Sequence, residues 1–412
     1  MSKAHDETIA ITAGADVAAR PRPYPAADSP AWLAVASLAF STFASVTTEF
    51  LPVGLLSGIA ASLGITEGQA GLMVTMPGLV AAITGPLLIV ASGRLDRRTL
   101  LLALSVLLVA SNLLAALAQD LPTMLAARVM LGLVVGGFWT FAPGATGHMV
   151  PAAEQGRAIS YVLAGISVAT VAGIPAGALL GNLAGWRAAF AVTAAVSAIV
   201  LALQWKVLPP MPAARAIGVR DLLAPLARRA PRILLAVALF LVAGHFVAYT
   251  YLGPILRQLF GMSPDGVGML LLAYGAAGIG GTFLAGRLVA RGVRATALAA
   301  AVTIGAVLLL ARFIGPGSLA AAFTVLAWGG AFGFVPVAMT SWMQQASPDA
   351  PEAGQALLVA VFQTAIALGA FIGGLAVDSR GIDGPVLLGG ASLAIAGILI
   401  LFTRTLSNKE KP

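Results

Sequence analysis

Long apolar runs alternate with short polar or charged breaks along the chain from about residue 32 onward. A helix needs about 20 mostly apolar residues to cross a hydrocarbon core about 30 Å thick, and each run is long enough to do so. The runs are 32–59, 69–92, 99–118, 121–148, 158–182, 187–208, 233–258, 266–286, 295–315, 317–343, 355–377 and 384–403. The pattern predicts an all-α membrane protein with twelve transmembrane helices.

Basic residues are distributed unequally between the two sides of these predicted spans. Nineteen of the 24 Lys and Arg residues lie in loops or tails on one side, four (Arg187, Arg257, Arg312 and Arg380) lie on the other, and Arg128 lies within a span. Cytoplasmic loops of membrane proteins carry an excess of Lys and Arg. We therefore expect both termini in the cytoplasm.

The longest polar connection divides the spans six and six. Residues 209–231 are rich in Pro and Arg and predict a cytoplasmic linker between an N-terminal bundle at 32–208 and a C-terminal bundle at 232–404. Residues 1–31 lack the basic start, apolar core and cleavage site of a signal peptide. We expect them to be a disordered cytoplasmic tail, with a second short tail at 405–412.

Short motifs recur in the two halves at a nearly constant spacing. They are Gly-Arg-Leu at 93–95 and 286–288, Gly-Gly at 136–137 and 329–330, and Gly-x-x-x-Gly at 173–177 and 369–373. The offsets are 193, 193 and 196 residues, which indicates duplication of a six-helix unit. Two such bundles related by an axis along the membrane normal, with a substrate site between them, are typical of secondary transporters.

Composition narrows the functional classes. Hydrophobic residues make up 59% of the chain and charged residues 10%, which is typical of a chain dissolved in lipid. The net charge of +8 is accounted for by the loop arginines, so we expect no nucleic-acid partner. There is no Cys, the three His are dispersed, and no zinc or phosphate-loop motif occurs, so we expect no metal, no cofactor and no enzyme activity. An intramembrane enzyme is the minor alternative. Transport must then be driven by an ion gradient.

Three motifs resemble those of the major facilitator superfamily, and the resemblance covers residues 32–404. The loop 93–98, Gly-Arg-Leu-Asp-Arg-Arg, is similar to a shortened form of the family's cytoplasmic signature Gly-x-Leu-x-Asp-Arg-x-Gly-Arg-Arg. Leu125-x-x-Arg128-x-x-x-Gly132 is similar to the second motif, and Gly173-x-Pro175-x-Gly177 to the antiporter motif. The resemblance implies the major facilitator fold, two pseudo-symmetric six-helix bundles, and export in exchange for protons.

The same motifs imply a set of conformational residues, namely Gly93, Asp96, Arg97, Gly173, Pro175 and Gly177. In the loop, the missing second Gly and the missing residue before Asp96 predict a weaker latch than the family signature. In span five, Pro175 frees a backbone carbonyl and bends the helix. We expect the two flanking glycines to allow close contact with the opposite half.

Finer matches point to one branch of the superfamily. The segment 47–56, Thr-Thr-Glu-Phe-Leu-Pro-Val-Gly-Leu-Leu, and Gly136-Gly137-Phe138-Trp139 resemble bacterial sugar-efflux and purine ribonucleoside-efflux proteins of the drug:proton antiporter-1 group. Residues 244–251 look more like the sugar exporters, whereas 359–363 look more like the nucleoside exporters. The substrate stays open between these classes, with multidrug or phenicol efflux as an alternative on the same fold.

Three residues are candidates for proton coupling. Glu49 lies about 25 Å along span one, in its outer half, where a carboxylate is costly unless it is protonated or paired. Arg128 lies at a similar depth in span four. Its guanidinium can pair with an ionised Glu49 or instead donate hydrogen bonds to backbone carbonyls. His245 lies near the middle of span seven and titrates near neutrality, so it can bind substrate, relay protons or simply pack.

A second group is predicted to bind the solute. Aromatic rings and hydrogen-bonding side chains together suit sugars and nucleosides, which have apolar faces and polar edges. The candidates are Thr48, Phe138, Trp139, Tyr249, Tyr251, Gln363 and Thr364. The expected partners are therefore a small-molecule substrate, protons and the lipid bilayer, and we expect the chain to be a monomer.

Overall fold

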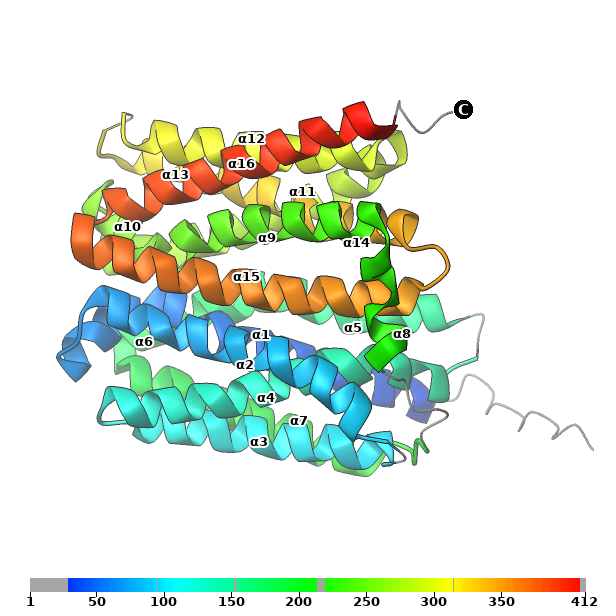
Figure 1. The fold of residues 1–412 in the computed structure, drawn as a ribbon. Helices are drawn as coiled ribbons and strands as arrows, with labels where there is room; N and C mark the ends of the chain where they lie inside the picture. The colour runs from blue at the N-terminus through cyan, green and yellow to red at the C-terminus, as the bar shows by residue number, and fades with distance from the viewer. Residues whose placement is uncertain (1–28, 94, 152–153, 213–218, 314, 408–412) are drawn as a thin grey trace, which may run out of the picture.

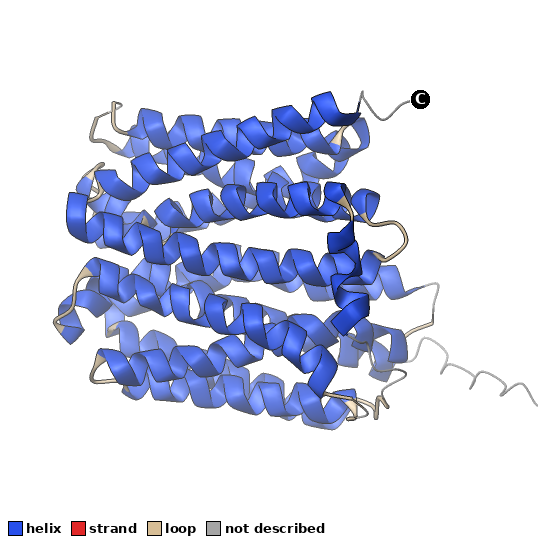
Figure 2. Ribbon diagram, in the orientation of Figure 1, coloured by secondary structure: helices blue, strands red, loops and turns tan. Residues whose placement is uncertain are grey.

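The computed structural model describes residues 29–407 except 94, 152–153, 213–218 and 314. Twelve helices among these residues are long and apolar enough to span a membrane, and no strand occurs in the described part (Figure 2). Figure 1 shows the first half of the chain as one bundle below and the second half as another above, with the helices of both running in the same general direction. This is the predicted all-α architecture of two six-helix bundles.

The N-terminal bundle contains the first six spans. Its helices are α1 (Ser29–Leu63), α2 (Glu67–Ala91), α3 (Arg97–Leu117), α4 (Leu121–Ala145), α5 (Gln155–Val168) continued by the π-helical segment η3 (Ala169–Gly173) and α6 (Ile174–Ala184), and α7 (Trp186–Val207). Polar caps begin several of them. Asp120, for example, accepts a hydrogen bond from the backbone N–H of Thr123 at the start of α4. Hydrogen bonding to Thr123 holds the pKa of the Asp120 carboxyl below its usual range.

The C-terminal bundle contains the other six spans. Its helices are α9 (Arg229–Tyr249) followed by α10 (Leu252–Gln258), α11 (Pro264–Arg291), α12 (Val293–Ala311), α13 (Ser318–Phe332) followed by α14 (Phe334–Ala346), α15 (Pro351–Arg380) and α16 (Asp383–Ser407). Spans seven and ten are interrupted where the sequence predicted single runs. In each case a proline, Pro254 or Pro336, lies four residues after the break and cannot bond to the carbonyl of Thr250 or Phe332.

The segments outside the bundles are described only in part. The predicted tail 1–31 lies outside the described residues up to 28, and α1 already begins at Ser29. Of the predicted linker, 213–218 lies outside the described residues, and the rest contains a short helix, α8 (Val219–Leu223), and a 3-10 turn at Ala224–Ala227. The predicted tail 405–412 begins inside α16, which continues to Ser407, and 408–412 lie outside the described residues.

The two bundles meet along two pairs of helices. On one side α2 lies against α15, and Gly78 of α2 faces the backbone oxygen of Gln363 so closely that an added Cβ would lie 2.9 Å from it. On the other side α11 lies against η3 and α6, where Gly275 faces the backbone of Thr170 and Gly268 faces Leu179. Small residues at these positions let the helix backbones approach closely.

One expectation about this contact is wrong. Gly173 and Gly177 were expected to touch the opposite half, but they pack against α1 of their own bundle, facing Thr47 and Leu51 respectively. Gly173 ends the π turn at Ala169–Gly173 and Gly177 follows it, and on this side of the molecule it is the glycines of α11 that allow the close approach between bundles. Glycines do allow helices of the two bundles to approach closely, but at this contact they belong to α11 and not to the predicted span five.

Candidate functional site

Glu49 lies in the contact between the two bundles. Helix α1 continues to Leu63, beyond the predicted end at 59, so Glu49 lies just past the middle of the helix. Its side chain is buried, with a relative exposure of 3%, and among the described residues it is the only buried acidic one. The Nε2 of Gln363, on α15 of the opposite bundle, donates a hydrogen bond to Glu49 Oε1 over 3.4 Å. The structure therefore brings these two predicted residues together across the bundle boundary.

Arg128 is buried next to Glu49 without an ion pair between them. Its Nη1 donates to the backbone oxygen of Thr48 over 2.8 Å, and its guanidinium lies 4.7 Å above the ring of Phe190. No N–O distance between Arg128 and Glu49 is 4.0 Å or less, although the two charges are near enough to interact electrostatically. Two guanidinium nitrogens, Nε and Nη2, have no hydrogen-bond partner. In this conformation the Arg128 guanidinium is therefore bonded to a backbone carbonyl, and its Nε and Nη2 donors are not used by any described residue.

Thr48 lies inside the N-terminal bundle rather than facing the other one. Its hydroxyl donates to Ala44 O over 2.7 Å and accepts from Nδ2 of Asn112 over 3.0 Å. Asn112 is fully buried in α3, and its Oδ1 has no partner. Sequence reasoning missed Asn112, although an amide inside an apolar span is a signal that marks such positions. Thr48, Asn112 and Arg128 thus form one polar network beside Glu49.

His245 lies at the centre of an aromatic cluster in the C-terminal bundle. Its ring stacks on Phe332, with centroids 3.7 Å apart and planes 10° apart, and on Tyr249, with centroids 4.9 Å and planes 21° apart. The Nε1 of Trp328 donates a hydrogen bond to His245 Nδ1 over 2.9 Å, and Tyr274 stacks beside Tyr249 with centroids 5.0 Å apart. Sequence reasoning paired His245 with Tyr249 but missed the rings contributed by α11 and α13.

Phe50 connects this cluster to the Glu49 site. It follows Glu49 in α1, and its ring contacts Phe246 (centroids 5.6 Å apart) and Tyr249 (6.4 Å) of the opposite bundle. Phe50 therefore lies between two groups: the Glu49–Gln363 pair and the rings around His245. Together they form a continuous polar and aromatic cluster at the bundle boundary, with the side-chain types that can stack on planar rings and exchange hydrogen bonds with a small solute.

The remaining predicted binding residues lie elsewhere. Phe138 packs edge to face with Trp139 in a cluster inside the N-terminal bundle that includes Leu101 and Leu104. Tyr251 is fully buried, and its hydroxyl donates to the backbone oxygen of Ala370. Thr364, next to Gln363, donates to the carbonyl of Ala360 in its own helix. In this conformation none of the four has a hydrogen bond or ring contact with Glu49 or His245.

The loop with the shortened signature is bonded within the N-terminal bundle. Asp96 caps α3 by accepting from the N–H of Arg98 over 2.7 Å, and its other oxygen accepts from the N–H of Met211 over 3.0 Å. Arg97 donates to Ser92 Oγ over 2.7 Å and lies over the ring of Phe141. Gly93, with φ of 44°, supplies the turn that precedes the cap. The signature thus holds the start of the inter-bundle linker.

The bundles are also hydrogen-bonded at the end of the helices remote from Ser29 and Ser407, which we call the outer end. There Asp378 of α15 accepts from the Thr66 hydroxyl over 2.7 Å and from the N–H of Gly68 over 3.1 Å. Thr66 is the N-cap of α2 and forms a capping box with Gln69. A carboxylate of one bundle therefore completes the cap of a helix in the other.

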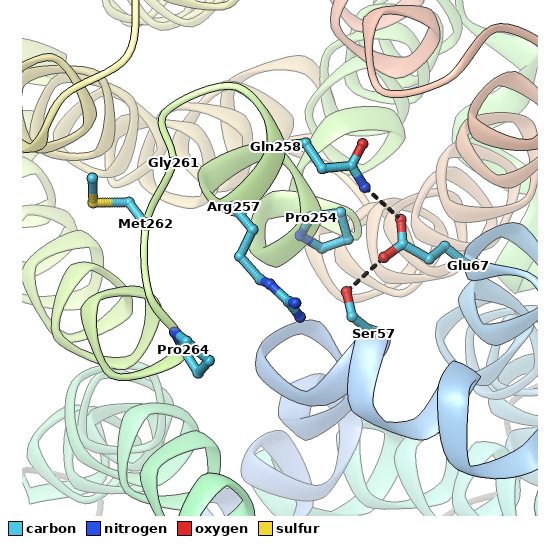
Figure 3. A pocket seen from close by; sticks show the side chains of 8 residues that line it. All are labelled: Ser57, Glu67, Pro254, Arg257, Gln258, Gly261, Met262 and Pro264. Atoms are coloured by element: carbon cyan, nitrogen blue, oxygen red, sulfur yellow. Dashed lines mark hydrogen bonds between the residues drawn. The ribbon is translucent and has the colours of Figure 1, made fainter.

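A cavity of about 360 Å³ lies at the outer end (Figure 3). It is lined by Ser57, Glu67, Pro254, Arg257, Gln258, Gly261, Met262 and Pro264. Figure 3 shows Glu67 between its two partners: it accepts from Ser57 Oγ over 2.6 Å and from Gln258 Nε2 over 3.3 Å. Helices α1, α2 and α10 are thereby joined at the mouth of the bundle boundary.

The sequence matches the family model described as Major Facilitator Superfamily, over residues 38–374 and 260–412. These two stretches together cover nearly all of both bundles. The chain belongs to the major facilitator superfamily. The family resemblance and the fold expected from the sequence are both confirmed, and the protein is a multi-pass membrane transporter.

Two relatives of this transporter carry different names. The "Transcription regulatory protein OpdE" of Pseudomonas aeruginosa is 36% identical over 380 residues, covering 91% of this chain and 94% of that protein. The "Purine ribonucleoside efflux pump NepI" of Escherichia coli is 33% identical over 398 residues, covering 96% of this chain and 97% of that protein.

Solved structures show the same fold at lower sequence identity. A D-xylose–proton symporter matches the transporter with a TM-score of 0.70 and 19% identity, covering 90% of this chain and 96% of that one. A bacterial homologue of the human lysosomal transporter Spinster, in an inward-facing and occupied conformation, matches with a TM-score of 0.71 and 14% identity, covering 90% and 96%.

Proposed function

We propose that this transporter exports small polar solutes in exchange for protons by alternating access, with purine ribonucleosides as the first candidates. The single observation that carries this proposal is Glu49, a buried carboxylate at the boundary of two bundles that move relative to each other in this mechanism. The relatives named as purine ribonucleoside efflux pumps support the choice of solute. In this proposal the outer end faces the periplasm across a bacterial inner membrane, and both termini are cytoplasmic.

The surroundings of Glu49 support proton coupling. An ionised carboxylate in a buried apolar setting is costly unless it is paired, and its hydrogen bond to Gln363 is long at 3.4 Å. A protonated Glu49 is compatible with this geometry without a cation. When the proton leaves, the charge is compensated by Arg128, whose Nε and Nη2 are not engaged. Protonation therefore changes the relative free energies of two conformations, which is the requirement for coupling.

Contacts between the bundles support one assignment of the access state. Asp378 with the start of α2, and Glu67 with Gln258, join the bundles at the outer end. In this proposal these bonds hold the periplasmic end closed while solute enters from the cytoplasm. Opening the outer end breaks these bonds, exposes Glu49 to the more acidic periplasm, and lets a proton replace the solute.

The test uses purified protein in proteoliposomes with an imposed pH gradient and labelled guanosine, adenosine, xylose and chloramphenicol. Glu49→Gln keeps the shape and removes the titration, so we expect pH-driven accumulation to fall to background while solute counterflow without a gradient continues. Asp383→Asn is the matched control, because Asp383 is also an acid near the outer end but pairs with Arg312 of its own bundle and does not join the two bundles. Undiminished pH-driven pumping by Glu49→Gln would sink the proposal, and a preference for chloramphenicol would redirect it to phenicol efflux.

A further inference from the structure

The hydrogen bond between Trp328 and His245 fixes the protonation of the imidazole. The indole N–H of Trp can only donate, so His245 Nδ1 must be the acceptor and carries no proton. In a neutral imidazole the proton is then on Nε2. A protonated imidazole would place an N–H on Nδ1 opposite the indole N–H, and two donors would face each other.

The rest of the ring is enclosed. Phe332 lies almost parallel to the imidazole with centroids only 3.7 Å apart, so it covers one face completely and Tyr249 must cover the other. Trp328 occupies the Nδ1 edge. The remaining polar edge is the one that carries Nε2–H. A 180° rotation of the imidazole in its own plane would keep both stacks but would lose the bond from Trp328, because a carbon would replace Nδ1.

Three buried polar atoms in or next to this cluster have no hydrogen-bond partner among the described residues: His245 Nε2, the Tyr274 hydroxyl and the Thr324 hydroxyl. Thr324 lies one helical turn before Trp328, so both side chains are on the same face of α13. A buried donor without an acceptor is destabilising, and native structures rarely retain one unless something binds to it. Three in one cluster point to a polar ligand.

We propose that His245 is a neutral hydrogen-bond donor to the exported solute, with Trp328 as the positioning residue that fixes its tautomer. The inference rests on the proposed function and assigns His245 to solute binding instead of proton relay. It requires a solute with a hydrogen-bond acceptor beside a flat or apolar face, such as a purine ring nitrogen or a ribose oxygen. Tyr274 and Thr324 provide further hydroxyl contacts to the same solute.

No charged group of the cluster offers an alternative explanation. The rings packed around His245 come from α9, α11 and α13, and of these only Tyr249 and Tyr274 can titrate; both are neutral at physiological pH. Glu49 and Arg128 lie on the other bundle and have no contact with the imidazole within hydrogen-bond distance. Among the described residues, His245 Nε2–H therefore has no charged side chain as its acceptor.

The tautomer can be observed directly. The chain has three His, so protein labelled with nitrogen-15 in histidine gives few imidazole signals, and the loss of one set in His245→Asn assigns that ring. We expect a neutral imidazole protonated on Nε2 at both pH 7 and pH 6, and a changed pattern in Trp328→Phe. A ring protonated on Nδ1, or doubly protonated at pH 6 in the unchanged protein, would overturn the proposal.

Two variants at position 245 test the role in binding. The amide nitrogen of Gln reaches the position of Nε2, whereas that of Asn reaches the position of Nδ1. For a solute that the unchanged protein exports, we expect His245→Gln to keep most of the apparent affinity and His245→Asn to raise KM about tenfold or more, because one buried acceptor is left unpaired. His148→Asn, at an exposed site, is the control.

The outcomes separate this inference from the proposed function. If the unchanged protein exports none of the tested solutes, the proposed function is wrong, and the nitrogen-15 spectra still decide the tautomer. If it exports a solute and the Gln and Asn variants have equal KM values, the imidazole does not donate to that solute and the inference is wrong, whatever Glu49→Gln shows. Equal values are also the result expected if Nε2 is satisfied by water alone.

Discussion

Asp378 allows a direct test of how the bundles close at the outer end. Its carboxylate accepts two hydrogen bonds from the start of α2, one from the Thr66 hydroxyl and one from the Gly68 N–H. These bonds exist only while α15 and α2 are together. Asp378→Ala removes both acceptors, and Asp378→Asn keeps one oxygen, so we expect both to favour the outward-open conformation, the first more than the second.

The size of the effect follows from helix capping. A side-chain acceptor at a helix N-terminus contributes about 1 kcal/mol and up to about 2 kcal/mol. Because Asp378 is exposed, the lower part of this range applies to each bond, and their sum stays within it. A change of 1–2 kcal/mol shifts an equilibrium by a factor of about 5–30. We expect the outward-open fraction to rise by that factor in Asp378→Ala.

Cysteine labelling measures this fraction. The chain contains no Cys, so Leu271→Cys introduces a single thiol without further changes. Leu271 is buried between the bundles, where it faces Gly54 of α1 close to the outer end. A membrane-impermeant maleimide added from outside reaches it only when the bundles separate. While opening and closing are faster than the reaction, the labelling rate is proportional to the open population, as for cleavage of transiently opened proteins.

The control is another aspartate at the outer end. Asp383 forms an ion pair with Arg312 (Oδ1 to Nε, 3.0 Å), and both residues belong to the C-terminal bundle. Asp383→Ala should therefore leave the labelling rate of Leu271→Cys unchanged. If Asp378→Ala is labelled no faster than Asp383→Ala, the cap between the bundles does not hold the outer end closed, and the reasoning is refuted.

Two further predictions concern packing and capping. Gly275→Ala places a Cβ against the Thr170 carbonyl, so we expect it to destabilise the outward-closed state by about 1–3 kcal/mol. The measurement is faster labelling of Leu271→Cys. Gly286→Ala is the control and should leave the labelling rate unchanged, because an added Cβ there meets open space. Equal labelling of the two would contradict the interface described here. Asp96→Ala removes the α3 cap and the bond to Met211, so thermal unfolding should occur at lower temperature by an amount equivalent to about 1 kcal/mol; an unchanged midpoint would show that the cap is replaced by water.

The number and placement of the spans were predictable because twelve apolar runs are the strongest signal in the chain. The breaks in spans seven and ten were not predicted, although Pro254 and Pro336 carry the information. A run of apolar residues shows where a span lies but not whether it is one rigid helix, since proline is tolerated inside α1 and α2 of the same protein. Which prolines break a helix depends on packing from neighbouring helices.

The candidate site was predictable only residue by residue. Glu49 and Gln363 were each identified from the sequence, but their contact joins positions 314 residues apart and depends on how the bundles pack. Trp328 and Tyr274 were missed, because aromatic residues are common in spans and their spacing does not show which rings meet. Phe138 and Trp139 belong to the Gly-Gly-Phe-Trp motif that resembles the efflux proteins, yet they lie inside the N-terminal bundle in this conformation.

The interruption of span seven separates two tasks mechanically. Helix α9 carries His245 and its stacked rings, while α10 carries Arg257 and Gln258 at the outer cavity. In a continuous helix, any tilt of the outer end would also move the rings that stack on His245. Because the helix is interrupted at Thr250 and Tyr251, a tilt of α10 that releases the solute does not have to move α9, and the stacked rings can keep their order for the next solute.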